Sequence, residues 1–407
     1  MPNGEEREDS AQVEGEGELS TPLVPPLRFT QDDGTPYPDW ETTTLGEVAS
    51  MRSGGTPTSS KKEYYGDDYF WVSIKDMTTQ GRFVNYSEKK ISEEGFRNSS
   101  THLFDTGTIL YAMYASVGEV SVLGTPATTS QAILGIVPET NILDKTYLYH
   151  FLLSYKKQAL AQKQTGTQPN LSKTIVEKFP IPLPTLPEQE KIANLLSLVD
   201  GKIENLDQQR ELWREYKRGL GARLFTQEYR FTQDDGTPYP DWETVQLGEV
   251  AKLYQSETLA KQDLEGGENP VYGANGIIGW TNKSNHRTSQ VVVACRGVCG
   301  MVNYTKPISW INGNSMVLNI DENETINKQY FYYAVSQISF EKIVSGSAQP
   351  QITRKPLSKI TLSVPSLGEQ GKIANLLSLV DGKIESLDQQ HKLWREYKQA
   401  LLQQLFP

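Results

Sequence analysis

The chain has 407 residues and a formal net charge of −10, which is enough sequence for two or three domains with buried cores. Cys295 and Cys299 are its only cysteines, so it can form neither a disulfide framework nor a four-cysteine zinc site, and a reducing compartment is expected. No apolar run reaches the ~20 residues that cross a bilayer and no signal-peptide pattern opens the sequence, which predicts a soluble, cytoplasmic protein without a membrane partner.

The charge is unevenly distributed along the chain. Residues 1–27 carry seven acidic residues against Arg7, with many Ser, Pro and Gly and little to bury, so we expect a disordered acidic tail. Without the −6 of this tail the remainder carries −4, and residues 50–178 and 252–364 carry +2 and +3. The negative total therefore does not exclude a nucleic-acid partner, which is recognised through a local basic surface.

Two blocks of sequence occur twice. Residues 28–49 recur as 230–251 with 20 of 22 positions identical, and residues 186–217 recur as 367–398 with 27 of 32 identical. Two long copies are too few for a solenoid, which stacks three or more short units. The chain is therefore expected to consist of two related halves, whether the near-identity reflects a shared physical requirement or a recent duplication or recombination.

The segments between the repeats align poorly but follow the same order of elements. In each, β-rich stretches precede an amphipathic helix, a Gly/Gln/Pro turn and a proline-rich strand, which predicts one mixed α/β fold for both. The expected β-rich stretches are 71–77, 106–124 and 132–138 in the first segment and 269–280 and 290–304 in the second, and the expected helices are 147–162 and 328–337.

The second repeated block predicts a long helix in each half. Pro187 suits the first turn, and apolar residues then follow the seven-residue pattern of a coiled-coil seam for about 35 residues, or ~50 Å. The two helices can bury these stripes against each other; alternatively, each packs on its own globular domain. The expected seam residues are Ile192, Leu195, Val199, Leu206, Trp213 and Tyr216 in the first helix and Ile373, Leu376, Val380, Leu387, Trp394 and Tyr397 in the second.

No catalytic pattern is present in the sequence. It contains no phosphate-binding loop of the GxxxxGK[ST] type and no glycine-rich methyl-donor loop, and its four histidines lack metal-ligand spacing. A nuclease site built from Asp39, Glu88 and Lys90 is disfavoured because Asp39 lies in a duplicated segment far from Glu88. The sequence therefore predicts a non-catalytic chain with no catalytic residue, metal site or cofactor of its own.

Several motifs together identify a family. RFTQDDGTPYPDW leading into LGEVA, GGTPTSSKKEYYGDDYFWVSIKDM, GTQPNLS and LPEQEKIANLLSLVDGKI resemble the specificity subunits of type I restriction-modification systems, over everything after the tail. The resemblance implies two β-rich target-recognition domains, separated by two long antiparallel coiled-coil-like helices in a pseudo-twofold arrangement. The implied domains are 28–185 and 228–366, and the implied spacer helices are 186–227 and 367–407.

The resemblance also implies the function and the partners. Each domain would read one half of a bipartite, asymmetric target in double-stranded DNA. The chain would dock two methyltransferase subunits and, in the full complex, two restriction subunits that translocate DNA. S-adenosylmethionine, ATP and Mg would then bind to those partners. Two other classes stay open: a protein scaffold that reads no DNA, and the recognition part of a fused methylase or nuclease.

Candidate DNA contacts follow from polar and basic loops in the two domains. Lysines and arginines would meet phosphates, a tyrosine would stack or pack, and the Gln and Asn of the paired turns could bond bidentately to adenine. For each group the alternative is an ordinary solvated loop. The candidates are Lys61, Lys62, Tyr64, Lys89, Lys90, Arg97, Gln168 and Asn170 in the first domain and Asn282, Lys283, Asn285, His286, Arg287, Arg296, Gln349 and Gln351 in the second.

Overall fold

The computed structural model describes residues 25–161, 170–264, 266–346 and 349–406. Most of the expected tail, and Gln168, therefore lie outside the described residues. Contacts divide the chain into two compact units: unit 1 contains residues up to Glu204 together with the chain from Lys392 onward, and unit 2 contains residues 205–391. Each unit thus combines one globular region with parts of two long helices, and each is described separately.

Unit 1 contains a five-stranded and a three-stranded sheet, and the β-rich stretches expected from the sequence contribute strands to both. The central strands of the larger sheet are almost wholly apolar and buried, which suits strands covered on both faces. The larger sheet has the order β2 (Ala49–Ser53), β9 (Ile133–Pro138), β6 (Ile109–Ala112), β7 (Val120–Leu123) and β4 (Phe83–Val84). The smaller has the order β5 (Lys89–Ile91), β3 (Tyr69–Val72) and β8 (Thr128–Thr129).

Two expected elements of unit 1 differ from the structure. The stretch 71–77 is a strand only to Val72, because Ser73 caps helix α2 (Ile74–Gln80) in a capping box with Asp76. The expected helix 147–162 is two helices, α4 (Lys145–Ser154) and α5 (Lys156–Ala161). The remaining elements are α1 (Leu45–Val48), η1 (Lys62–Tyr64), α3 (Glu93–Arg97), α6 (Lys173–Glu177) and the antiparallel pair β1 (Glu41–Thr44) and β10 (Pro180–Leu183).

Unit 2 repeats this scheme with a different arrangement of strands. A four-stranded sheet has the order β12 (Lys252–Gln255), β18 (Ser315–Asn319), β15 (Val291–Ala294) and β16 (Val302–Tyr304). A three-stranded sheet has the order β14 (Gly276–Thr281), β13 (Asn269–Gly273) and β17 (Trp310–Ile311). The antiparallel pair β11 (Glu243–Gln246) and β19 (Thr361–Val364) corresponds to β1 and β10. The helices are α8 (Leu247–Val250), η2 (Lys261–Leu264), α9 (Lys328–Ser336), η3 (Glu341–Ile343) and α10 (Arg354–Ser358).

The two repeated blocks of sequence bind to each other within each unit. In unit 1, Nε and Nη2 of Arg28 donate to the Glu188 carboxylate at 3.1 and 2.9 Å, and the indole N–H of Trp40 donates to it at 2.9 Å. Glu188 is fully buried in the first turn of the long helix. In unit 2 the equivalent contacts join Arg230 and Trp242 to Glu369. The blocks therefore recur together because each anchors the other.

The predicted long helices are confirmed as α7 (Leu186–Phe225) and α11 (Leu367–Leu405). Their first turns pack on the globular region of their own unit: Ile192 and Val199 belong to the core of unit 1, and Ile373 to the core of unit 2. The alternative, that each helix packs on its own globular domain, is thus correct for these turns. Of the other expected seam residues, Leu206, Val380 and Leu387 are buried, whereas Leu195, Leu376, Trp213 and Trp394 are only partly buried.

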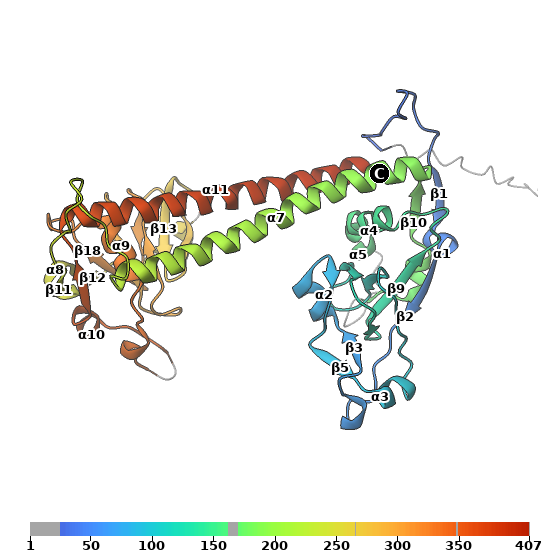
Figure 1. Cartoon of the computed structure of the whole chain (residues 1–407), viewed down its shortest axis with the longest axis horizontal. Helices are drawn as coiled ribbons and strands as arrows, with labels where there is room; N and C mark the ends of the chain where they lie inside the picture. The colour runs from blue at the N-terminus through green and yellow to red at the C-terminus, as the bar shows by residue number, and fades with distance from the viewer. Residues whose placement is uncertain (1–24, 162–169, 265, 347–348, 407) are drawn as a thin grey trace, which may run out of the picture. The chain divides into compact units, whose positions relative to one another are not determined.

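Farther along, the helices pair with each other. In unit 2 they lie side by side and antiparallel (Figure 1), since Lys217 binds Asp381 at 2.6 Å, Arg210 binds Asp388, and Asp207 lies 3.1 Å from His391. The expectation that Tyr216 and Tyr397 lie in this seam is wrong. They are 53% and 49% exposed, because Lys217 and its counterpart Lys398 take the adjacent inward positions.

A duplicated aspartate links each globular region to the helices. In unit 1 the buried Asp200 binds Lys398 of α11 at 2.6 Å and Arg82 of the globular region at 3.1 Å. His150 lies 3.7 Å from the same carboxylate, but its burial, with the nearby Lys398 and Arg82 cations, lowers the pKa of His150 to about 2, so the ring is neutral. In unit 2 the equivalent Asp381 binds Lys217 and accepts a hydrogen bond from a tyrosine hydroxyl of α9.

Candidate nucleic-acid interface

The basic candidates of unit 1 come together at one end of its fold. The backbone N–H of Ser92 donates to the Tyr64 carbonyl at 3.1 Å, which joins η1 to the segment between β5 and α3. The elements β3, β5 and α3 lie together at this end (Figure 1), so Lys62, Lys90 and Arg97 share it although 35 residues separate the first from the last. The structure thus places both basic clusters of the sequence at one end of unit 1.

Of the two roles expected for the tyrosine, stacking or packing, Tyr64 takes the packing role. It is 5% exposed, and its hydroxyl accepts a hydrogen bond from Nζ of Lys61 at 2.8 Å. The same ammonium lies 4.6 Å from the centroid of the Tyr64 ring, and the hydrogen bond raises the pKa of Lys61. Tyr64 is therefore part of the core, and it orients Lys61 instead of contacting a base.

The remaining cations of this end differ in their partners. Lys90 lies 3.7 Å from Asp67 and above the Phe70 ring, and Arg97 binds Glu93 at 2.6 Å. Lys62 and Lys89 are exposed and form no ion pair within the described parts of the chain. Lys62 and Lys89 are accordingly the candidates of this end that are free to meet a phosphate.

Two loop candidates of unit 2 form hydrogen bonds inside the domain. His286 is 8% exposed, its Nε2 is 2.8 Å from the Tyr254 hydroxyl, and its Nδ1 is 2.7 Å from Oδ1 of Asn285. Burial lowers the pKa of His286, so this ring is held neutral inside the domain. The Asn285 amide is bonded to both backbone groups of Ile311. Both ring nitrogens of His286 are thus engaged inside the domain, which does not favour its predicted contact with DNA. Asn285 is exposed, and its contact with DNA stays a prediction.

The other members of this loop are more accessible. Lys283 forms a 3.2 Å ion pair with Asp263, so its charge is partly neutralised. Asn282 and Arg287 are exposed, and their side chains form no ion pair or hydrogen bond with any residue that the structure describes. Arg287 is thus a free cation at the surface of unit 2.

The structure brings three candidates from distant parts of unit 2 into one hollow. The turn after β15 pairs with the Gln/Pro segment: Arg296 and Gln351 are antiparallel bridge partners, and Ile352 N–H donates to the Cys295 carbonyl at 3.0 Å. Around them is a hollow of about 270 Å³. Its lining consists of Arg296, Gly297, Gln349, Pro350 and Gln351.

Unit 1 has the same turn with different side chains. Leu171 N–H donates to the Met113 carbonyl at 2.9 Å, as Ile352 does to Cys295, so Tyr114 occupies the position of Arg296. The next residue has positive φ in both, +53° for Ala115 and +75° for Gly297, which confirms that the turns match. Asn170, the counterpart of Gln351, is partly buried. Sequence reasoning missed Tyr114, although aligning YAMYASVG with VACRGVCG on their glycines would have found it.

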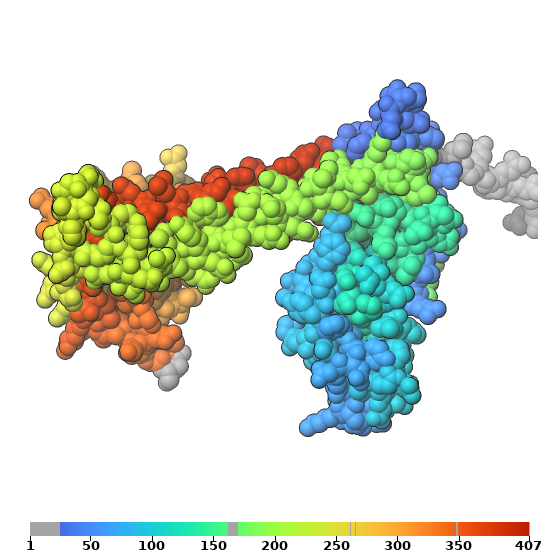
Figure 2. Space-filling view, viewed as in Figure 1, coloured from blue at the N-terminus to red at the C-terminus, as the bar shows by residue number. Residues whose placement is uncertain are grey.

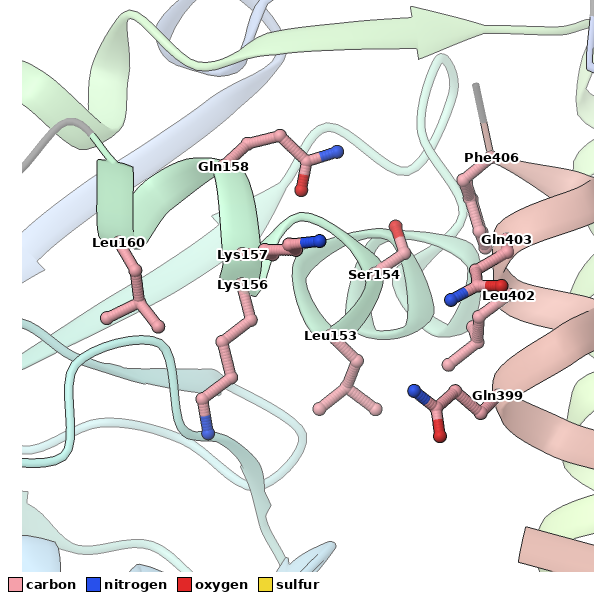
Figure 3. A pocket seen from close by; sticks show the side chains of 10 residues that line it. All are labelled: Leu153, Ser154, Lys156, Lys157, Gln158, Leu160, Gln399, Leu402, Gln403 and Phe406. Carbon is pink, nitrogen blue, oxygen red and sulfur yellow. The ribbon is translucent and has the colours of Figure 1, made fainter. Parts of the chain in front are cut away.

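A hollow in unit 1 contains none of the candidate DNA-contacting residues. It lies between α4, α5 and the last turns of α11, and its lining includes Leu153, Leu160, Gln399, Gln403 and Phe406 (Figure 3). Lys156 at its edge is paired with Glu119. This groove is part of the packing of unit 1.

The described residues contain no group of histidine, cysteine or carboxylate side chains that could hold a metal ion. Within the same ranges, no helix combines the length and the apolar composition that a membrane crossing requires.

Comparison with known proteins agrees with the geometry. A family model described as the type I restriction modification DNA specificity domain matches residues 37–212 and 239–393. The MjaIX specificity subunit of Methanocaldococcus jannaschii is 27% identical over 236 residues, covering 56% of this chain and 55% of that protein. The EcoprrI specificity subunit of Escherichia coli is 23% identical over 359 residues, covering 84% and 88%. The chain thus spans about half the length of the first relative and most of the second.

Solved structures show the same fold. The S subunit of a type I system from M. genitalium covers 95% of this chain and 99% of its own, with a TM-score of 0.63 and 20% identity. A chain from a study of complex assembly and conformational transition in the type I system covers 90% and 97%, with a TM-score of 0.53 and 18% identity. Since the family model matches most of the sequence, once in each half, the chain belongs to the family of type I restriction-modification DNA specificity subunits.

Proposed function

We propose that this chain is the non-catalytic subunit that selects the DNA sequence of a type I restriction-modification complex. Each globular region reads one half of a bipartite, asymmetric target, and the helices dock two methyltransferase subunits and, through them, restriction subunits. The observation that carries the proposal is a pair of matching turns with unlike side chains. Tyr114 in unit 1 and Arg296 in unit 2 occupy equivalent positions in these turns. Like frames with unlike contacts are what reading two different half-sites requires.

The distribution of charge supports this division of labour. The globular regions are only weakly basic, and the free cations named above are few, so this chain alone offers limited phosphate binding. Partner subunits that add phosphate contacts would supply the rest. S-adenosylmethionine, ATP and Mg would belong to those partners, because the described residues offer no metal cluster and the sequence no nucleotide loop.

A repeated apolar stripe on the long helices is the proposed docking surface. On α7, Leu198 is 74%, Leu212 63% and Tyr216 53% exposed. The spacings of 14 and 4 residues place them within about 40° of one line along the helix. On α11 the equivalent residues Leu379, Leu393 and Tyr397 are exposed to the same degree. The surface of α7 within unit 2 is uncovered in Figure 2. Exposed apolar residues in this number indicate an interface, and two copies suit two identical partners.

Replacing Leu212 and Leu393 by glutamate should abolish stable assembly with the methyltransferase. Each leucine is exposed, so the chain should fold normally, whereas a charge in a desolvated contact should weaken each docking event by about 10- to 100-fold. Co-purification and sedimentation of the reconstituted complex measure this. Arg218→Glu is the matched control, since it introduces the same charge at an exposed position on another face of α7. Equal assembly of the leucine variant and the control would contradict the proposed docking surface.

The proposed function is tested by mapping methylated bases in host DNA with and without the gene for this chain. We expect one two-part motif to lose methylation when the gene is deleted. Replacing residues 50–178 by the corresponding segment of a relative should change one half of the motif and leave the other unchanged. Methylation that does not depend on the chain would contradict sequence recognition and favour a scaffold that reads no DNA.

A further inference from the structure

The hollow of unit 2 holds an arginine whose charge is not satisfied by the protein. Arg296 is exposed, and its guanidinium forms no ion pair or hydrogen bond with any residue in the described ranges. Its bridge partner Gln351 is also exposed, and side chains of directly opposed residues in an antiparallel bridge point to the same face. A free guanidinium and a free amide therefore stand next to each other.

Backbone hydrogen bonds fix the main chain at both residues. Gln351 exchanges two hydrogen bonds with Ser345, at 2.8 and 2.9 Å, and Ile352 N–H binds the Cys295 carbonyl at 3.0 Å. Cys295 is 1% exposed and continues the buried strand β15, so Arg296 starts from the end of a fixed strand. Gly297, with φ of +75°, then turns the chain sharply away. The backbone positions of Arg296 and Gln351 are accordingly fixed, and their exposed side chains extend from a defined turn.

Arginine and glutamine select different bases by geometry. The planar fork of arginine matches the O6 and N7 acceptors of guanine in the major groove, and glutamine can bond to N7 and N6 of adenine. We infer that Arg296 reads a guanine in the half-target of unit 2, with Gln351 beside it contacting the neighbouring base. This inference rests on the proposed function and names the residue that carries part of its specificity.

The equivalent position of unit 1 sharpens the inference. Tyr114 has one hydroxyl and is 37% exposed, so it cannot form the two parallel hydrogen bonds that arginine forms with guanine. The ring of Tyr114 suits stacking or apolar contact, for example with a thymine methyl group. The guanine read by Arg296 therefore has no counterpart at the equivalent position of the other half-target, which makes the target asymmetric at this point.

The test uses the full chain assembled with its methyltransferase subunits. Arg296→Ala should lower the preference for guanine at one position of one half-target by about 10- to 100-fold, and leave the other half unchanged. Tyr114→Ala should act only on the other half. Arg287→Ala is the matched control: it removes another free, exposed arginine of unit 2, and should weaken binding to all sequences equally without changing a base preference.

Base analogues identify the contact. A duplex with 7-deazaguanine at the assigned position lacks the N7 acceptor. The unaltered complex should bind this duplex about 10-fold more weakly than the guanine duplex, whereas the Arg296→Ala complex should bind the two duplexes equally. Inosine keeps O6 and N7 and should bind the unaltered complex like guanine. An Arg296→Ala complex that keeps the guanine preference and the sensitivity to 7-deazaguanine would overturn this inference alone. An unaltered complex without any sequence preference would instead overturn the proposed function.

Discussion

Replacing Glu188 by alanine is expected to lower the free energy of unfolding of unit 1 by about 3 kcal/mol, because it leaves buried donors without an acceptor. The carboxylate is fully buried and accepts two hydrogen bonds from Arg28 and one from the Trp40 indole. The Arg28 side chain is itself only 18% exposed, so water can replace the lost partner only in part. Urea unfolding followed by circular dichroism and tryptophan fluorescence measures the change.

The first control lies on the same helix. Glu190 is exposed, so Glu190→Ala should change the free energy of unfolding by no more than about 0.5 kcal/mol. Glu188→Gln keeps one oxygen that can accept from the Trp40 indole, but it replaces the other acceptor of the carboxylate by an NH2 donor and removes the charge. Its effect should therefore fall between the two. Glu369→Ala should repeat the loss in unit 2, because Arg230 and Trp242 depend on it in the same way. Equal stability of the Glu188→Ala and Glu190→Ala chains would show that the buried anchor is not needed.

Lengthening both long helices by one turn is expected to lengthen the unspecified gap of the DNA target. Both α7 and α11 pass without interruption from one unit into the other. Four added residues extend a helix by about 6 Å, which corresponds to one or two base pairs at ~3.4 Å each. Under the proposed function, the two half-sites should therefore stay the same while the gap between them grows by one or two base pairs. Mapping methylated motifs in cells that express the altered chain measures this.

The insertion has to be matched in the two helices. The contacts Asp207–His391 and Arg210–Asp388 mark one level of the antiparallel pair, so insertions after Gln208 and after Gln389 extend both helices at that level. Insertion into α7 alone is the control, and it should abolish methylation because every contact beyond that level loses its register. An unchanged gap with the matched insertion would contradict the role of the helices as the spacer.

The sequence predicts the large elements because their signals are local. A seven-residue apolar pattern after Pro187 predicts α7, and β-rich apolar stretches predict the main strands of both units. The element boundaries that were predicted wrongly also follow from local signals, but these signals are single residues. The strand β3 ends before Ser73, because Ser73 caps α2 in a capping box with Asp76. This signal was present in the sequence as a Ser-x-x-Asp capping box within an otherwise β-rich stretch.

The candidate site is harder to predict because exposure depends on distant partners. His286 is buried, and its ring forms a hydrogen bond with Tyr254, which lies 32 residues earlier in the chain. Arg28 and Glu188 are 160 residues apart, and only the fold brings them together. The turn that carries Arg296 was recognised as a candidate, but its pairing with Gln351 across a bridge could not be derived from spacing.

The duplicated Arg–Glu–Trp anchor allows the variable part of each globular region to be replaced without loss of its attachment to the long helices. The arginine, glutamate and tryptophan of this anchor lie in the near-identical blocks that flank each region, whereas the loops that would meet bases lie between those blocks. A crossover between the gene segments that encode the repeated blocks would therefore introduce a new set of loops and keep the anchor residues unchanged. Half of a recognition sequence could thus be replaced in one genetic event, with no adjustment required of the enzymes that perform the chemistry.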